Sequence, residues 1–249
     1  MSLFKIGNTI HHFDTLDSTN NYAANVFKKG DIKCGTVILA DNQTNGRGQR
    51  DNSWYAEPHA NLTFSFVISV EKLHSNAILK PILMSSIGLV NFLQRHHTKA
   101  QIKWPNDIMV NNKKIAGILI ENFYTGKQLN FCVVGIGLNI NQTDFDGFSA
   151  TSLAIEKGKS FPLQEILESV IYQLNLAFNS YHHAAYAEVL AVYNSLLWKK
   201  DQVVNFTQVA KASRHEGIIR SVDSEGCLHI EVDGEVNLFR NGEVKMEVG

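Results

Sequence analysis

The sequence has no apolar run approaching the roughly 18 residues that a membrane-spanning helix needs. Its first residues, MSLFKIGNTIHHF, lack the apolar segment of a signal peptide and indicate a first strand. Charge of one sign is not in excess either, because 23 basic residues face 24 acidic ones for a net charge of −1. This balance argues against a chain-wide basic surface for DNA or RNA, although a local patch would not show in the sum. We therefore expect a cytoplasmic protein with no membrane or nucleic-acid partner.

Cysteine is scarce as well. The three cysteines, Cys34, Cys132 and Cys227, are widely spaced and odd in number, which favours reduced thiols over disulfides or metal ligands. Three pairs of adjacent histidines occur, but none stands at a zinc-binding spacing, so no protein metal site is predicted. Internal repeats and low-complexity linkers are absent from the sequence.

The patterns that are present predict alternating strands and helices over the first 198 residues. Helices are predicted at 21–29, from near Ile78 to His97, from Pro162 to Tyr181 and from His183 to Trp198. Strands are predicted at 35–40, 61–70, 101–104, 108–110, 114–122 and 129–139. The second of these strands alternates apolar and polar residues, which is typical of a half-buried antiparallel strand.

From Gln202 the sequence pattern changes to short runs typical of β-strands, at 203–206, 217–222, 227–232 and 235–239. Turn residues separate these runs, a pattern typical of a small β-barrel. We therefore predict two parts, residues 1–198 and residues 199–249, that pack directly against each other.

Two polar segments in the first half of the chain could carry chemistry. The segment DSTN, residues 17–20, is by itself a good helix cap, with Ser18 or Thr19 as the N-cap residue. In GRGQR, residues 46–50, the glycines allow positive φ and can aim backbone N–H groups at an anion. Arg47 and Arg50 add guanidinium groups suited to phosphate or carboxylate, although the segment also fits a solvated hairpin tip. It is not a Walker loop, because the GxxxxGK[ST] pattern is absent.

Two further segments lie beside predicted strands. In KWPND, residues 103–107, Pro105 favours an extended Trp104. Lys114, which heads an apolar strand, is either an edge residue that aids solubility or a buried cation facing a ligand. The glycines of GIGLN, residues 135–139, indicate that another group closely approaches the strand, or else that the strand contains two bulges. A Rossmann site is disfavoured, since GIGLNI lacks the third glycine and leads into no predicted helix.

Six motifs occur in a fixed order between about residues 14 and 155. They are DSTN, Gln43 with GRG and a following tryptophan, KWPND, KIAGILIE, GIGLN and ATSL. Together they resemble the biotin protein ligase family. The resemblance implies an α+β fold, with a mixed or antiparallel sheet flanked by helices as in class II aminoacyl-tRNA synthetases, and a small SH3-like barrel.

The resemblance also implies a reaction. The family joins biotin to ATP, carried with Mg²⁺, as biotinyl-5′-AMP, and then transfers biotin to one lysine of the carrier domain of a biotin-dependent carboxylase. Many members carry an N-terminal DNA-binding domain, whereas this chain begins at the catalytic part, so a repressor role is not implied. Whether the chain is a monomer or a homodimer stays open.

Site residues follow from positions that match the family motifs. Lys114 and Arg47 would be catalytic cations, and Asp107 is the candidate acceptor for the proton of the incoming lysine. The biotin site would comprise Ser18, Thr19, Asn20, Gln43, Gly46, Arg47, Gly48, Gln49, Lys114, Gly117, Gly135 and Gly137. The ATP site would comprise Arg47, Arg50, Trp54, Lys114 and Asn139, with Trp54 and Asn139 meeting the adenine.

One position departs from the usual family pattern, GRGR, because Gln49 stands where a second arginine is common. Gln49 brings no charge, and the sequence leaves open whether Arg50 turns inward to compensate. An acyl adenylate must be shielded from water, so we also expect residues 44–53 to be mobile without ligand and to close on binding.

Three other functions compete with this interpretation. A lipoate–protein ligase has similar chemistry, but its arginine-rich, triple-glycine motif is absent. A biotin-binding regulator without turnover would use the same pocket. A nucleic-acid-binding module built from the GRG loop and the small barrel is disfavoured by the near-neutral charge and the lack of interleaved aromatic residues.

Overall fold

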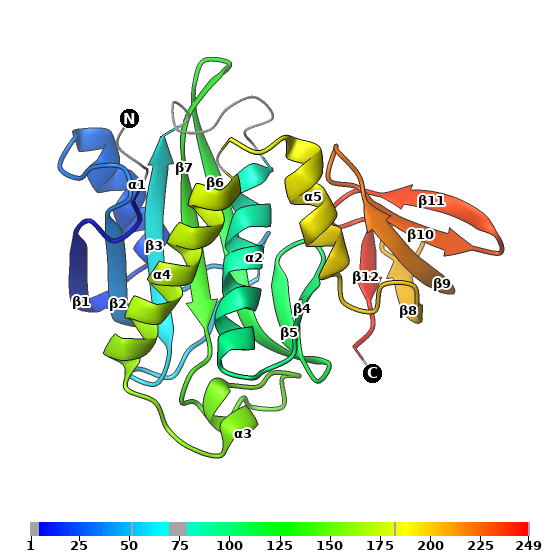
Figure 1. Cartoon of the computed structure of the whole chain (residues 1–249), viewed down its shortest axis with the longest axis horizontal. Coiled ribbons are helices and arrows are strands. Elements are labelled where there is room, and N and C mark those ends of the chain that lie inside the picture. The colour runs from blue at the N-terminus through cyan, green and yellow to red at the C-terminus, as the bar shows by residue number, and fades with distance from the viewer. Residues whose placement is uncertain (1–4, 51, 70–78, 182, 249) are drawn as a thin grey trace.

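A computed structural model describes residues 5–50, 52–69, 79–181 and 183–248, which form two sheets (Figure 1). The larger sheet has seven strands in the order β1-β2-β3-β7-β6-β5-β4, and the smaller has five in the order β11-β10-β9-β8-β12. In the larger sheet β1 and β2 pair in parallel, and the other described neighbours pair antiparallel. The predicted mixed sheet is therefore present.

The strands of the larger sheet are β1 (Ile10–Leu16), β2 (Val37–Gln43), β3 (Leu62–Ser69), β4 (Ala100–Lys103), β5 (Asp107–Val110), β6 (Lys113–Thr125) and β7 (Gln128–Leu138). The helices are α1 (Thr19–Lys29), α2 (Lys80–Arg95), α3 (Leu153–Lys157), α4 (Leu163–Tyr181) and α5 (Tyr186–Ser195). The smaller sheet contains β8 (Val203–Gln208), β9 (Ser213–Val222), β10 (Leu228–Val232), β11 (Glu235–Phe239) and β12 (Val244–Met246). The sequence patterns did not predict α3 and β12, which are both short.

Local sequence accounts for the helix ends. The Ser18 side chain caps α1 by accepting a hydrogen bond from the backbone N–H of Asn21, and Gly30 closes the helix in the left-handed conformation at φ 82°. Pro81 lies in the first turn of α2, where its missing N–H costs no helical hydrogen bond. The predicted start of this helix near Ile78 lies outside the described residues.

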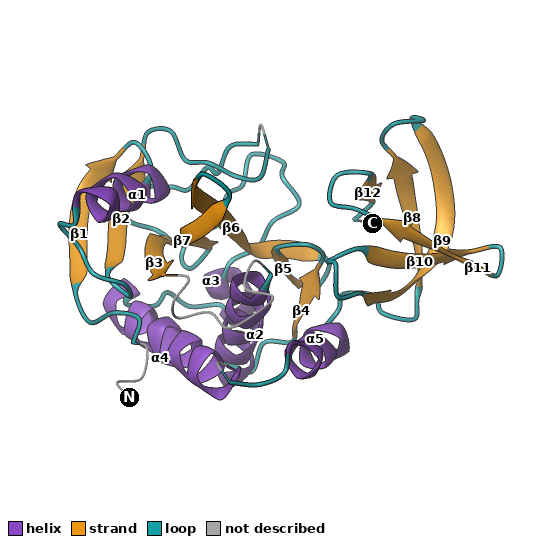
Figure 2. Cartoon of the chain, turned by 90° about the horizontal axis from the view of Figure 1, so that it is seen from above, coloured by secondary structure: helices purple, strands orange, loops and turns teal. Residues whose placement is uncertain are grey.

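Helices cover both faces of the larger sheet. Figure 2 shows α2 and α4 on one face and α1 on the other. The even-numbered residues of β3, among them Phe64 and Phe66, join the main core with α2 and α4, whereas Val67 packs in a second core with Ala23 of α1. The prediction that β3 is half-buried was therefore wrong. Its polar residues Thr63 and Ser65 face the α1 side and are buried there instead of meeting solvent.

The two sheets share the main apolar core, which contains Phe92 of α2 as well as Phe206 and Ile219 of the smaller sheet. Trp104 Nε1 donates to the carbonyl of Gly226 at 3.0 Å, and the Trp104–Pro105 peptide bond is cis. Direct packing of the two parts is thus confirmed. Among the described residues, no helix is long and apolar enough to cross a membrane.

Candidate functional site

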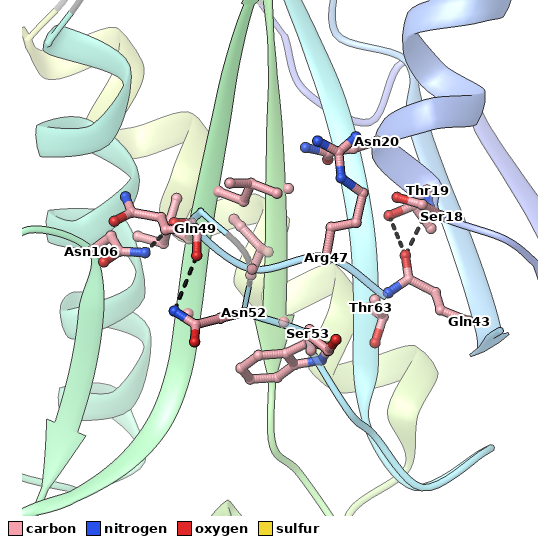
Figure 3. A pocket seen from close by; sticks show the side chains of 18 of the residues that line it. Ser18, Thr19, Asn20, Gln43, Arg47, Gln49, Asn52, Ser53, Thr63 and Asn106 are labelled. Atoms are coloured by element: carbon pink, nitrogen blue, oxygen red, sulfur yellow. Dashed lines mark hydrogen bonds between the residues drawn. The ribbon is translucent and has the colours of Figure 1, made fainter. Parts of the chain in front are cut away.

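A pocket of about 320 Å³ opens on the α1 side of the larger sheet (Figure 3), a volume that suits a small organic molecule. The predicted site residues in its lining are Ser18, Thr19, Asn20, Gln43, Arg47, Gly48, Gln49, Trp54, Asp107, Lys114, Gly117, Gly135 and Gly137. Lining residues that the sequence did not single out are Asn52, Ser53, Thr63, Asn106, Ile118, Leu119 and Ile136. The fold therefore gathers motifs that are up to about 120 positions apart in the chain into one cavity.

Small residues on adjacent strands form the floor of this pocket. Thr63 of β3 lies opposite Gly137 of β7, which lies opposite Gly117 of β6, which in turn lies opposite Asp107 of β5. Side chains at directly opposed positions share one face of a sheet. The register thus leaves a shallow row across four strands, with the Asp107 carboxylate at its end.

Two side chains occupy the space above the glycines of β7. A Cβ added to Gly135 would lie 2.3 Å from Oδ1 of Asn20, and one added to Gly137 would lie 2.2 Å from Cε2 of Trp54. The pairing of β7 is regular at both glycines, so the alternative of two bulges was wrong. The glycines allow Asn20 and Trp54 to pack directly on the strand.

We expect Gly135→Ala to raise the KM for biotin, the ligand that the family resemblance implies, about five- to thirtyfold, because the added methyl group must displace the Asn20 amide, and a misplaced hydrogen-bond partner commonly costs about 1–2 kcal/mol. Steady-state kinetics at saturating ATP would measure the effect. Gly126→Ala is a useful control, since an alanine there meets nothing within 4 Å and its strain at φ 60° is confined to the turn between β6 and β7. An unchanged KM in Gly135→Ala would contradict the placement of Asn20 in the binding site.

Hydrogen bonds fix the polar groups at the start of α1. Oε1 of Gln43 accepts from the backbone N–H of Thr19 at 2.8 Å and from the Thr19 hydroxyl at 3.1 Å (Figure 3). Oγ of Ser65 lies 2.6 Å from Oγ1 of Thr19 and 2.6 Å from Oδ1 of Asn20. This network sets the amide orientation of Gln43, whose Nε2 is left to donate.

Arg47 is held by an acidic residue of β6. Its Nη2 lies 2.7 Å from Oε1 of Glu121, and its Nη1 donates to Oδ1 of Asn21 at 2.7 Å. The other carboxylate oxygen of Glu121 accepts from Nδ2 of Asn20 at 2.8 Å. Glu121 therefore connects the predicted catalytic arginine to the predicted biotin site. It belongs to the motif KIAGILIE, but nothing in the sequence indicated which groups it would contact.

Lys114 and Asp107 form an ion pair at the far end of the floor, with Nζ 2.6 Å from Oδ1. The Lys114 ammonium also lies 5.4 Å from the centre of the Trp54 ring, within cation–π range. Lys114 lines the pocket and lies on β6, an inner strand of the sheet, so it is not an edge residue; that its ammonium group faces a ligand stays a prediction. Burial lowers the pKa of the neighbouring Lys103, and the Asp107 carboxylate opposes this shift.

The described residues of the segment from Gly46 to Trp54, hereafter the GRG loop, fold back on one another as a hairpin. Trp54 N donates to Gly46 O at 2.9 Å, and Gly48 N donates to Asn52 O at 2.7 Å. The two glycines would allow positive φ, but among the described residues of this loop positive φ occurs only at Arg50, with φ 58°. Gly46 is needed because a Cβ there would lie 2.2 Å from the carbonyl oxygen of Trp54. Residue 51 lies outside the described residues, so the expected mobility of 44–53 stays a prediction.

Three predicted residues do not line the pocket: Gly46, Arg50 and Asn139. Arg50 points away from it and donates to the carbonyl oxygens of Asn241 at 2.5 Å and Gly242 at 3.5 Å. Arg50 therefore does not turn into the pocket to compensate for Gln49. Asn139 is buried, and its Nδ2 donates to the carbonyl of Thr151 at 3.0 Å. In this structure its side chain is bonded to the backbone and does not line the pocket, so its contact with adenine stays a prediction.

Residues absent from the prediction lie mainly on strands. Thr63 lines the pocket, and Ser65 binds two side chains that do, because β3 turns its polar face toward α1. The alternation of polar and apolar residues in β3 was visible in the sequence. It was interpreted as exposure, because a single sequence does not show that a helix covers the second face.

Residues 12–139 match the model of the biotin/lipoate A/B protein ligase family. A bifunctional ligase/repressor of Escherichia coli, BirA, is 28% identical over 247 residues, covering 96% of this chain and 74% of that protein. A biotin–[acetyl-CoA-carboxylase] ligase of Mycobacterium tuberculosis is 24% identical over 215 residues, covering 84% of this chain and 78% of that protein.

Among solved structures, the biotin protein ligase from Aquifex aeolicus in complex with biotin and ATP superposes with a TM-score of 0.79 at 22% identity. The match covers 97% of this chain and all of that one. This likeness confirms the predicted fold class, a mixed sheet flanked by helices with an SH3-like C-terminal sheet.

Proposed function

The chain belongs to the biotin/lipoate A/B protein ligase family and is a biotin protein ligase, and from this premise we propose that it makes biotinyl-5′-AMP from biotin and ATP and then biotinylates a carrier lysine. One observation carries the proposal. The same pocket contains an ordered row of amide and hydroxyl groups at one end and an ammonium group at the other. This arrangement can bind a polar ring and stabilise an anionic reaction centre.

The polar end of the pocket suits the ureido ring of biotin, which has two N–H donors and one carbonyl acceptor. With its oxygen bonded to Thr19, Gln43 presents its Nε2 as a donor, while Oδ1 of Asn20, oriented by Ser65, supplies an oxygen acceptor. Leu119, which lies opposite Gly135 on the same face of the sheet, supplies apolar surface nearby for the thiophane ring. We propose that Ser18, Gly48, Gly117, Gly135 and Gly137, which also line the pocket, complete the biotin site.

The first step brings the biotin carboxylate to the anionic α-phosphate of ATP, and pyrophosphate leaves as the new C–O–P linkage forms. Two unit charges 4 Å apart repel by roughly 4 kcal/mol at an effective dielectric of 20. The Lys114 ammonium offsets this repulsion at the reaction centre. Arg47 supplies a second cation once its guanidinium leaves Glu121 for the ligand.

In the second step, the amine of the acceptor lysine attacks the biotinyl carbonyl, AMP leaves, and the amine loses a proton. We propose that Asp107 orients this amine and accepts the proton, since its carboxylate lies on the pocket floor beside Lys114. Trp54 and Asn139 remain our proposed contacts for adenine.

Mg²⁺ is proposed to arrive with ATP. The described residues contain no group of three or more histidine, cysteine, aspartate or glutamate side chains able to hold a metal ion. The triphosphate itself offers the oxygen ligands that Mg²⁺ prefers.

The proposed partner is the carrier domain of a biotin-dependent carboxylase. DNA binding is not part of the proposal, since a net charge of −1 gives it no support. We also propose that residues 1–198 carry the biotin and ATP sites, with residues 199–249 as a C-terminal unit.

Biotin is expected to protect residues 44–53 from proteolysis, because a loop that closes over an adenylate is ordered by the ligand. Limited digestion with and without biotin, followed by mass spectrometry of the fragments, would measure this. Equal cleavage rates in the two samples would show that the loop does not act as a lid.

The proposed function is tested with labelled biotin, ATP and a purified carrier domain. Label on the carrier lysine, dependent on ATP, is the expected result. Biotin binding without transfer would support a regulator instead, and transfer of lipoate in preference to biotin would support the related ligase activity.

A further inference from the structure

The tip of the GRG loop contacts the smaller sheet. Residues 240–243 connect β11 to β12, and this segment is hereafter the C-terminal turn. The Arg50 guanidinium donates to two of its carbonyl oxygens, those of Asn241 at 2.5 Å and Gly242 at 3.5 Å. Nδ2 of Asn241 in return donates to Oε1 of Gln49 at 3.1 Å. Three hydrogen bonds thus join segments about 190 positions apart in the chain.

The C-terminal turn has a shape that admits the guanidinium. Gly242 has φ 85°, and a Cβ added to it would lie 1.4 Å from Nη2 of Arg50 and 1.6 Å from Cζ. The arginine therefore fills the space where any other residue would place its side chain. The turn is braced internally, because the backbone N–H of Glu243 donates to the Arg240 carbonyl and the Glu243 carboxylate accepts from the Arg240 N–H.

Arg50, which makes this contact, has a backbone conformation of higher energy. Arg50 has φ 58°, in the left-handed region that side-chain-bearing residues occupy at a cost of roughly 1 kcal/mol. A cationic donor on neutral carbonyl oxygens gives a stronger hydrogen bond than a neutral pair does, which offsets this cost. The conformation that aims Arg50 outward is therefore stabilised by the C-terminal turn.

Holding the tip of the GRG loop also fixes its two arms. The Gly48–Asn52 and Gly46–Trp54 hydrogen bonds make the loop a hairpin, so a restraint at Arg50 reaches Arg47 on one arm and Trp54 on the other. Both of these side chains line the pocket.

We propose that the C-terminal turn is a positioning element for the GRG loop, and that Arg50 and Gln49 are the residues through which it acts. The inference rests on the proposed function, in which the loop covers the adenylate. It assigns a task to the smaller sheet: holding Arg47 and Trp54 over the ligand and slowing escape of the adenylate. It also accounts for Gln49, which serves as an acceptor for Asn241 in place of a charge in the pocket.

The test variant is Gly242→Ala, whose methyl group displaces the Arg50 guanidinium. Gly234→Ala is a matched control, because Gly234 also lies in a turn of the smaller sheet with φ 84° but an alanine there meets nothing within 4 Å. Both substitutions carry the same backbone strain, and only the first removes the contact. A third variant, Arg50→Ala, removes the contact from the loop side.

The first readout does not require ligase activity. Hydrogen exchange in the free protein is expected to speed up at residues 46–50 in Gly242→Ala and Arg50→Ala, while Gly234→Ala matches the wild type there. Combining Gly242→Ala with Arg50→Ala should add nothing further at the loop, since both remove one interaction. Equal loop exchange in Gly242→Ala and Gly234→Ala would overturn the proposal.

The second readout is the rate at which biotinyl-5′-AMP escapes from its preformed complex in the absence of carrier. We expect Gly242→Ala to raise this rate about five- to tenfold, with little change for Gly234→Ala. Faster exchange without faster escape would show that the contact exists but does not position the loop, which also overturns the proposal. Failure of the wild type to form any adenylate would instead refute the proposed function, and the exchange result would still decide whether the contact exists.

Discussion

Replacing Lys114 by alanine is expected to slow formation of biotinyl-5′-AMP by about 100- to 1,000-fold. The ammonium group lines the pocket and lies where two anionic groups must meet, so its loss leaves their repulsion unopposed. Its removal also leaves the Asp107 carboxylate without its partner, which adds a further negative charge at the same place. Pyrophosphate release in a single turnover, with saturating biotin and ATP, measures this step separately from transfer.

The neighbouring residue provides the control for this prediction. Lys113 is exposed at the start of β6, so Lys113→Ala removes the same charge from the chain without changing the pocket. Lys114→Arg should restore part of the rate if charge is what matters. Similar rates for Lys114→Ala and Lys113→Ala would refute the assigned role.

Asp107→Asn is expected to slow transfer of biotin to the carrier by about 100-fold or more, with a much smaller effect on adenylate formation. The amide keeps the size of the carboxylate but cannot accept the proton that the acceptor amine must lose. Transfer is measured by mixing purified enzyme–adenylate complex with carrier domain, and adenylate formation by pyrophosphate release.

Asp233→Asn serves as the comparison, because Asp233 lies in an exposed turn of the smaller sheet at φ 52°, a conformation that asparagine also tolerates. A competing explanation is that Asp107 acts solely by positioning the Lys114 ammonium group, with which it forms an ion pair. In that case both half-reactions would fall by the same factor, and the base assignment would be wrong.

The C-terminal unit shares its apolar core with the rest of the chain, so it cannot be removed without exposing that core. Trp198 and Leu197 pack in the same apolar cluster as Phe206, Leu228 and Ile230. Ending the chain near residue 200 would expose this surface to water, and lost activity could then reflect unfolding alone. Single substitutions in the C-terminal turn leave the core intact and are the sharper test.

The sequence by itself determined most of the elements and the family. Hydrophobic periodicity, Ser18 as a cap, Gly30 as a stop and Pro81 in a first turn are local features, and local features depend on residues a few positions apart. The ordered motifs carried the family and most of the pocket lining for the same reason, since each motif is a short segment whose side chains act at one place.

Only the tertiary structure decided how those segments meet. The pairing register of four strands, β3, β7, β6 and β5, brings Thr63, Gly137, Gly117 and Asp107 into one row. The sequence of a single strand does not specify which residues of its neighbours it pairs with. The direction of Arg50 depended on a carbonyl group about 190 positions away. Contacts over such separations are set by the packing of the whole chain, so a local pattern could identify the arginine but not the group to which it binds.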